Sequence, residues 1–180
     1  MKAERVIGQT DMNQNSGGTS RSRITGPNGL VTDGTRLLVS EYQNHRVLGY
    51  SKFPGSGLAD ADFVIGQEKF EENKERSGSD TVGGPGKILL LNGDLFVTDF
   101  TQNRVMVFKN LGPKNAPSAD LVIGQKDFTS TGSGAGLDQL NRPVALASDG
   151  GMLFISDYAN NRILAFKKIP AANEILYGYW

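Results

Sequence analysis

Three pairs of oppositely charged residues are the strongest candidates in this sequence for catalysis or for binding a polar ligand. Each pair is an acid followed five residues later by an arginine: Glu41 with Arg46, Asp99 with Arg104, and Asp157 with Arg162. Such groups, arranged in a ring, could transfer protons or hold a polar ligand. An acid that begins a turn also accepts backbone N–H groups, and an arginine can pair with it across a hairpin. Because the same turn recurs in every copy, we predict a structural role for all six residues.

The other residues of catalytic type give weaker signals. His45 is the only histidine, and Asn103 and Asn161 stand at the equivalent positions, so we predict a structural role for it as well. The sequence has no cysteine and therefore no thiolate ligand. It shows no nucleophile–base pair, no phosphate-binding loop and no metal-ligand spacing. We predict no cofactor, and calcium held by acidic and asparagine side chains remains the open alternative.

The charged pairs belong to a repeat that runs through the whole chain. The segment Val-Ile-Gly-Gln begins at residues 6, 64 and 122, which gives a period of 58 residues. A proline, an apolar run that ends in the acid, and an apolar run that begins with the arginine recur at the same spacing. We predict a single domain over residues 1–180, with repeats at 3–60, 61–118 and 119–176.

Each repeat is predicted to form four short β-strands, the last being the Val-Ile-Gly of the following repeat. The first two strands are joined by Asp33-Gly34, Asn92-Gly93 or Gly150-Gly151, which favour two-residue hairpin turns. Second strands such as Leu95-Phe96-Val97 are apolar on both faces, as in a sheet covered on both sides. These features are typical of β-propeller blades. The predicted fold class is therefore all-β, with three blades of four antiparallel strands.

Two of the turn segments resemble the signature of NHL repeats. They are Glu41-Tyr42-Gln43-Asn44-His45-Arg46-Val47 and Asp157-Tyr158-Ala159-Asn160-Asn161-Arg162-Ile163. The resemblance implies a β-propeller, commonly of six blades, of which this chain would be one half. It also favours an extracytoplasmic setting, although we find no signal peptide in the sequence. Blade two departs from the pattern at Lys87 and Leu91.

Three blades are too few to close a ring, because propellers have about four to eight. We expect a homodimer of six blades, in which the strand Val6-Ile7-Gly8 of each chain completes blade three of the other. A longer natural chain that supplies further blades is the alternative. The tail at residues 175–180 offers another way to complete blade three, or it covers the interface.

The predicted function is a non-catalytic scaffold that binds a protein, peptide or glycan on its loop face. Loops at about 10–25, 68–83 and 126–141 lead into the innermost strands, and functional residues often concentrate in such loops. The candidate binding residues are Arg21, Arg23, Lys74, Arg76 and Lys87. The chain has 19 basic and 19 acidic residues, which argues against binding nucleic acid through phosphates, and no apolar run is long enough to span a membrane. The alternative is a metal-dependent hydrolase or lyase with a site at the central channel.

Overall fold

The computed structural model describes residues 1–167, which form three antiparallel β-sheets. Blade one consists of β1 (Pro27–Thr32), β2 (Leu37–Glu41), β3 (Arg46–Tyr50) and β4 (Phe63–Ile65), in that order. Blade two consists of β5 (Pro85–Leu91), β6 (Asp94–Asp99), β7 (Arg104–Phe108) and β8 (Leu121–Ile123). Blade three consists of β9 (Pro143–Ser148), β10 (Leu153–Asp157) and β11 (Arg162–Phe166). The predicted all-β fold of blade-like sheets is confirmed.

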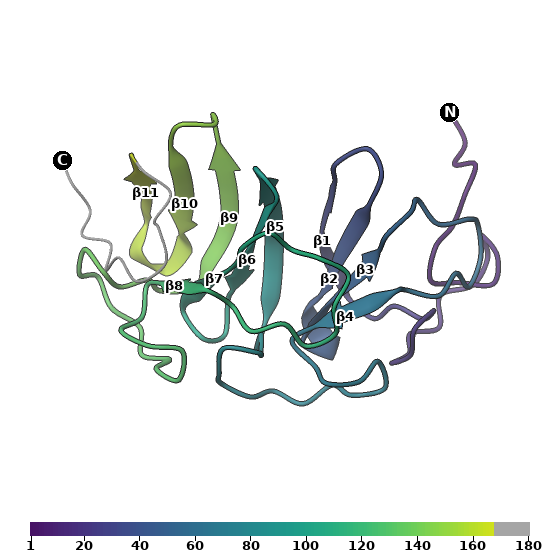
Figure 1. Ribbon diagram of the computed structural model, residues 1–180, viewed down its shortest axis with the longest axis horizontal. Helices are drawn as coiled ribbons and strands as arrows, with labels where there is room; N and C mark the ends of the chain where they lie inside the picture. The colour runs from purple at the N-terminus through teal and green to yellow at the C-terminus, as the bar shows by residue number, and fades with distance from the viewer. Residues whose placement is uncertain (168–180) are drawn as a thin grey trace.

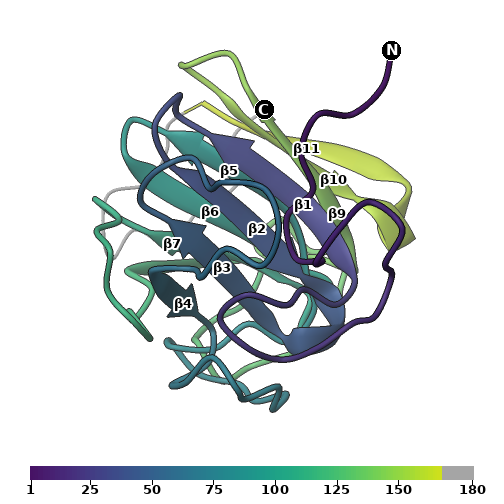
Figure 2. The ribbon, with the colours of Figure 1, turned by 90° about the vertical axis from the view of Figure 1, so that its right-hand side faces the viewer.

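The three blades stand side by side in an arc, with blade two in the middle (Figure 1). Their first strands β1, β5 and β9 contact one another in that order. The N-terminal segment lies beside blade one, at the opposite end of the arc from blade three, and passes in front of blade one in Figure 2. No helix within residues 1–167 has the length and apolar character needed to cross a membrane.

Hydrophobic clusters fill both spaces between the blades. Leu38 of blade one packs in the same cluster as Val97 of blade two. One repeat later, Phe96 of blade two shares a cluster with Ile155 of blade three. All residues of β2, β3 and β7 are buried. These strands lack the alternation of apolar and polar residues because both of their faces are covered.

The predicted fourth strands are present in the first two blades. The Val-Ile of the second repeat lies in β4 and that of the third repeat lies in β8, and each pairs with the third strand of the preceding blade. Within residues 1–167, blade three has three strands. The predicted alternative roles of residues 175–180 lie outside the described residues.

The predicted two-residue hairpin turns are correct in blade two and wrong in the other blades. Leu91 pairs with Asp94, so Asn92-Gly93 alone forms the turn, with φ angles of 52° and 89°. The corresponding hairpins of blades one and three have four-residue loops at residues 33–36 and 149–152.

An aspartate explains the longer loops. Asp33 accepts the backbone N–H groups of the residues two and three positions further on, and Asp149 does the same. This arrangement stabilises a wider turn through the side chain. Leu91 occupies the equivalent position in blade two and has no acceptor, so the chain reverses in the shorter turn there.

Candidate binding site on the loop face

The acid–arginine pairs connect each blade to the long loop that leads into it. Asp99 Oδ2 lies 3.0 Å from Arg104 Nε, and both side chains are fully buried. Asp99 also accepts the backbone N–H groups of Gly83 and Gly84, and Arg104 Nη2 donates to the carbonyl oxygen of Thr81. Arg104 Nη1 donates to the carbonyl oxygen of Phe128, in the loop after β8. The pair is therefore held by the loops before β5 and after β8, and neither side chain reaches the surface to meet a ligand.

The other two pairs have the same geometry and differ in burial. Glu41 accepts from Arg46 Nε and from the backbone N–H of Thr25, and it is fully buried. Burial raises the pKa of Glu41, and the guanidinium of Arg46 opposes that rise. Asp157 accepts from Arg162 Nε at 2.8 Å, but 26% of the Arg162 side chain is exposed.

His45 lies in the turn between β2 and β3, which begins with the 3-10 helix η1 (Tyr42–Asn44). It has a left-handed backbone conformation, as do Asn103 and Asn161, with φ angles of 50°, 54° and 53°. Its Nδ1 contacts the carbonyl oxygen of Gly83 in the following loop. In the part of the chain that the structure describes, no three His, Cys, Asp or Glu side chains gather as a metal site.

Two of the predicted binding residues are held by contacts with their own blade. The guanidinium of Arg21 donates to the carbonyl oxygen of Ala61 at 2.9 Å, and its carbon lies 4.8 Å from the ring centroid of Phe70. Arg23 donates to the carbonyl oxygen of Ser16 at 3.4 Å. These contacts order the loop between the N-terminal segment and β1.

The other three candidate residues divide between a loop and a strand. Lys74 and Arg76, in the loop after β4, pair with Glu72 and Glu68 at 3.0 and 3.4 Å. Lys87 lies on β5, is exposed, and donates to the backbone carbonyl oxygen of Asn28 on β1. The five candidates therefore do not converge on one site, and Lys87 alone lines a cavity at the first strands.

That cavity has a volume of about 430 Å³ and lies where the first strands of the three blades meet. The rings of Tyr42 and Phe100 meet edge to face, with centroids 6.3 Å apart and planes at 65°. The guanidinium carbon of Arg142 lies 5.6 Å from the ring centroid of Phe100. The cavity is lined by Asn28, Tyr42, Gly86, Lys87, Phe100, Pro143 and Val144. It combines an aromatic wall with apolar surface and an ammonium group.

Sequence reasoning missed the aromatic wall, although the sequence carries a signal for it. Tyr42, Phe100 and Tyr158 each follow directly after the acid of their repeat. The acid is buried at the end of its strand, so the next residue lies in the turn on the loop face. Tyr158 begins the 3-10 helix η2 (Tyr158–Asn160) and is 61% exposed. Aromatic rings at such positions stack on sugars or apolar side chains, while nearby cations bind carboxylates.

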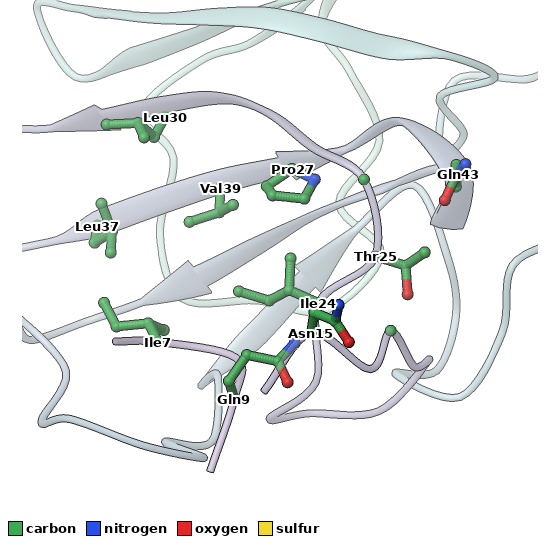
Figure 3. Close-up of a pocket in the computed structure, with 12 residues that line it drawn as sticks. Ile7, Gln9, Asn15, Ile24, Thr25, Pro27, Leu30, Leu37, Val39 and Gln43 are labelled. Atoms are coloured by element: carbon green, nitrogen blue, oxygen red, sulfur yellow. The ribbon is translucent and has the colours of Figure 1, made fainter. Parts of the chain in front are cut away.

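A second cavity, of about 620 Å³, lies on the side of blade one that faces away from blade two (Figure 3). Side chains of β1 and β2 form one wall, and those of the N-terminal segment and of the loop before β1 form the other. Pro27, Leu30, Leu37 and Val39 lie on the first wall, and Ile7 and Ile24 lie on the second. Of the residues between 1 and 167 that line this cavity, none has a charged side chain. Its surface is therefore suited to packing against protein.

The sequence matches no protein-family profile and no curated protein. Among solved structures, it is similar to the selenomethionine-substituted virginiamycin B lyase from Staphylococcus aureus, with 10% identity and a TM-score of 0.42 over 84% of this chain and 44% of that one. A streptogramin B lyase structure is 11% identical, with a TM-score of 0.34 over 84% of this chain and 43% of that one. The chain thus spans less than half the length of either structure, and neither similarity assigns it an activity.

Proposed function

We propose that this chain is an NHL-type propeller unit without catalytic activity that binds a protein, peptide or glycan on its loop face. The observation that carries the proposal is the cavity between Tyr42 and Phe100, with Lys87 at its edge. An aromatic wall beside an ammonium group suits a ring or apolar group that bears a carboxylate. Acidic sugars and the acidic side chains of peptides next to apolar groups have this chemistry.

Lys87 determines the preference for an anion in this proposal. An ammonium group has three donors, and the carbonyl oxygen of Asn28 accepts from one of them, which leaves two for a ligand. Gly29 and Ala145 occupy the equivalent positions in blades one and three. Blade two alone therefore supplies a cation from its first strand, and the carboxylate of the ligand should lie over β5.

Two small probes test the proposal by NMR: phenylacetate, which has a ring and a carboxylate, and glucuronate, which is an acidic sugar. Amide signals of uniformly ¹⁵N-labelled protein are followed up to about 10 mM probe, a range in which weak fragments bind. We expect saturable shifts of Lys87, Phe100 and Val144 with at least one probe. The same titration shows whether the site prefers the flat ring or the sugar.

A matched pair of variants gives the control. Lys87→Gln should weaken binding about tenfold, the effect of losing a hydrogen bond to a charged group. Lys114→Gln removes the same charge from an exposed loop of blade two and should leave the affinity unchanged. The absence of saturable shifts at the cavity with both probes, or equal losses in the two variants, would contradict the proposal.

A further inference from the structure

We propose that two copies of this chain form a closed six-bladed ring, in which blade three of each copy packs on blade one of the other. The open face of blade one is the side that carries Leu30, Phe53 and the 620 Å³ cavity. The open face of blade three is the side that carries Phe154 and Ile163, away from blade two. In a twofold arrangement, the open face of blade one in each copy meets the open face of blade three in the other, so both faces are covered.

The open face of blade one exposes positions that are buried in blade two. Leu30 is 73% exposed, whereas its equivalent Ile88 is 8% exposed. Phe53 is 55% exposed, whereas its equivalent Leu111 is 6% exposed. Ile88 and Leu111 are buried in the cluster between blades one and two. The face shown in Figure 3 therefore has the composition of a surface that another blade covers.

The open face of blade three shows the converse pattern. Phe96 and Val105 of blade two are completely buried against blade three. Their equivalents in blade three are Phe154, which is partly exposed, and Ile163, which is 63% exposed. Along β10, buried residues alternate with partly exposed ones, as in a sheet with one covered face.

The N-terminal segment already lies where the fourth strand of a preceding blade belongs. Ile7 packs against the cluster on the open face of blade one, just as Ile65 of β4 packs in the cluster between blades one and two. Gly8 and Gly66, which follow these residues, have φ angles of 89° and 91°. The segment is therefore held in strand position by blade one.

The hydrogen bonds of this segment match those of β4. The carbonyl oxygen of Val6 accepts from the N–H of Gly57 at 2.7 Å, and that of Val64 accepts from the N–H of Ala116 at 2.9 Å. In both cases a loop of the following blade binds the outward edge of the strand. The N–H and C=O groups of Ile7 point to the opposite side of the segment, away from Gly57. The equivalent residue of β4, Ile65, pairs on that side with Val47 of β3.

The register of the proposed strand pair follows from blade one. Val64 lies opposite Leu48, but its backbone N–H and C=O groups form hydrogen bonds with residues 115 and 116. Val64 and Leu48 are therefore a non-hydrogen-bonded pair of the antiparallel ladder. The same register places Val6 of one copy opposite Leu164 of the other. Within residues 1–167, β11 has β10 as its strand neighbour and its other edge accepts the new strand.

Gln9 provides an independent indication of the same contact. Gln67 Nε2, one repeat later, donates to the carbonyl oxygen of His45 in the turn of its blade, at 2.9 Å. Gln67 Nε2 also donates to the carbonyl oxygen of Lys74 at 2.8 Å, and Gln9 Nε2 makes the equivalent bond to Ser16 at 3.0 Å. Within residues 1–167, the second N–H of Gln9 Nε2 has no counterpart of the His45 carbonyl. The residue equivalent to His45 in blade three is Asn161. In the closed ring, the backbone carbonyl of Asn161 from the second copy accepts from Gln9.

A second copy is the occupant that these observations specify. Packing of one blade on the next occurs twice within the chain, between blades one and two and between blades two and three. Each copy carries both of the faces needed to form this contact again, so no different partner surface is required. Among residues 1–167, no charged side chain lines the cavity on blade one, and Phe154 and Ile163 are apolar, so these surfaces can meet without burying an unpaired charge.

A disulfide tests the register directly, because the chain has no cysteine of its own. The double variant Val6→Cys, Leu164→Cys places the two residues in a non-hydrogen-bonded pair, with Cα atoms about 4.5 Å apart, within the range of a disulfide. Oxidation should give a covalent dimer on a non-reducing gel. The control Lys114→Cys, Leu164→Cys, in which Lys114 lies on an exposed loop of blade two, should give none.

Light scattering over a dilution series tests the interface. The unmodified chain should have twice the 19.4 kDa mass of one copy. Ile163→Asp places a charge in the contact and should weaken association about 100-fold or more, whereas Leu137→Asp, on a loop between blades two and three, should leave the dimer intact. A 19.4 kDa mass, a mass that grows with concentration, or a dimer that resists Ile163→Asp would overturn the proposal. If Ile163→Asp fails to fold by circular dichroism, the cysteine pair decides, and its failure to cross-link overturns the register.

Discussion

Asp99 Oδ2 lies 3.0 Å from Arg104 Nε with no exposed area on either side chain, whereas the equivalent Arg162 beside Asp157 is 26% exposed. The two pairs have the same chemistry and differ in their surroundings. Blade two is covered on both faces, and blade three is covered by blade two on one face. The buried pair therefore depends fully on its internal partners, because water cannot replace either of them.

Removing one partner of the buried pair should destabilise the chain strongly. Asp99→Ala leaves the guanidinium of Arg104 buried without a counter-ion, and we expect a loss of about 3–5 kcal/mol in the free energy of unfolding. Lys74→Ala opens the pair with Glu72, in which 65% of the lysine side chain is exposed, and should cost much less. Urea unfolding followed by circular dichroism measures both. Equal losses in the two variants would show that burial does not govern the Asp99–Arg104 pair.

The close approach of β1 and β5 should make Gly29 intolerant of a side chain. A Cβ at Gly29 would lie 2.6 Å from the carbonyl oxygen of Gly86, which is backbone and cannot rotate away. We expect Gly29→Ala to destabilise the fold by about 1–3 kcal/mol, the usual cost of overpacking. Gly55→Ala is the matched control, because no atom lies within 4 Å of its added Cβ. Thermal unfolding that does not distinguish the two variants would refute this contact.

Asp127 should make stability depend on pH in the acid range. Hydrogen bonds from Ser130 and Thr129 lower the pKa of this carboxyl from 3.8 to about 2. Because the pKa is lower in the folded state, the stabilisation is present above pH of about 4 and is lost as the pH falls toward about 2. NMR titration of the carboxyl carbon measures the pKa. Asp127→Asn should flatten the pH dependence of the melting temperature between these limits, and an unperturbed pKa of 3.8 would contradict the assignment.

Divalent cations should leave the melting temperature unchanged. Residues 1–167 bring together no three His, Cys, Asp or Glu side chains that could hold a metal ion. An ion that binds the native state at 100 times its dissociation constant adds about 2.7 kcal/mol of stability, which thermal unfolding detects readily. We expect the same melting temperature with calcium, zinc or EDTA. A rise of several degrees with one ion would favour the metal-dependent hydrolase or lyase alternative over the binding scaffold.

The repeat in the sequence was sufficient to predict the architecture. The Val-Ile pairs of the second and third repeats lie in β4 and β8 because each is the outer strand of the preceding blade. The apolar runs β2 and β7 of blades one and two are buried on both faces, as predicted. The hairpin loops were predicted less well, since a single change from Asp33 to Leu91 between repeats alters the turn length. Local patterns therefore fix which segments are strands better than they fix the loops between them.

The candidate site was beyond sequence reasoning because it depends on contacts between blades. Tyr42 and Phe100 are 58 residues apart, and their rings meet only because the first strands of adjacent blades are neighbours. Arg21 had the appearance of a free loop cation, but the fold brings its guanidinium over the ring of Phe70. Lys87 was identified through its departure from the repeat, and the structure shows the cavity that it lines.

Small-angle X-ray scattering from the unmodified chain is the most direct test of a ring closed by two copies. Forward scattering should give twice the 19.4 kDa mass. The radius of gyration should be about 21 Å, the value for a compact particle of about 360 residues. A mass of 19.4 kDa, with the elongated profile of an open three-blade arc, would contradict the closed ring.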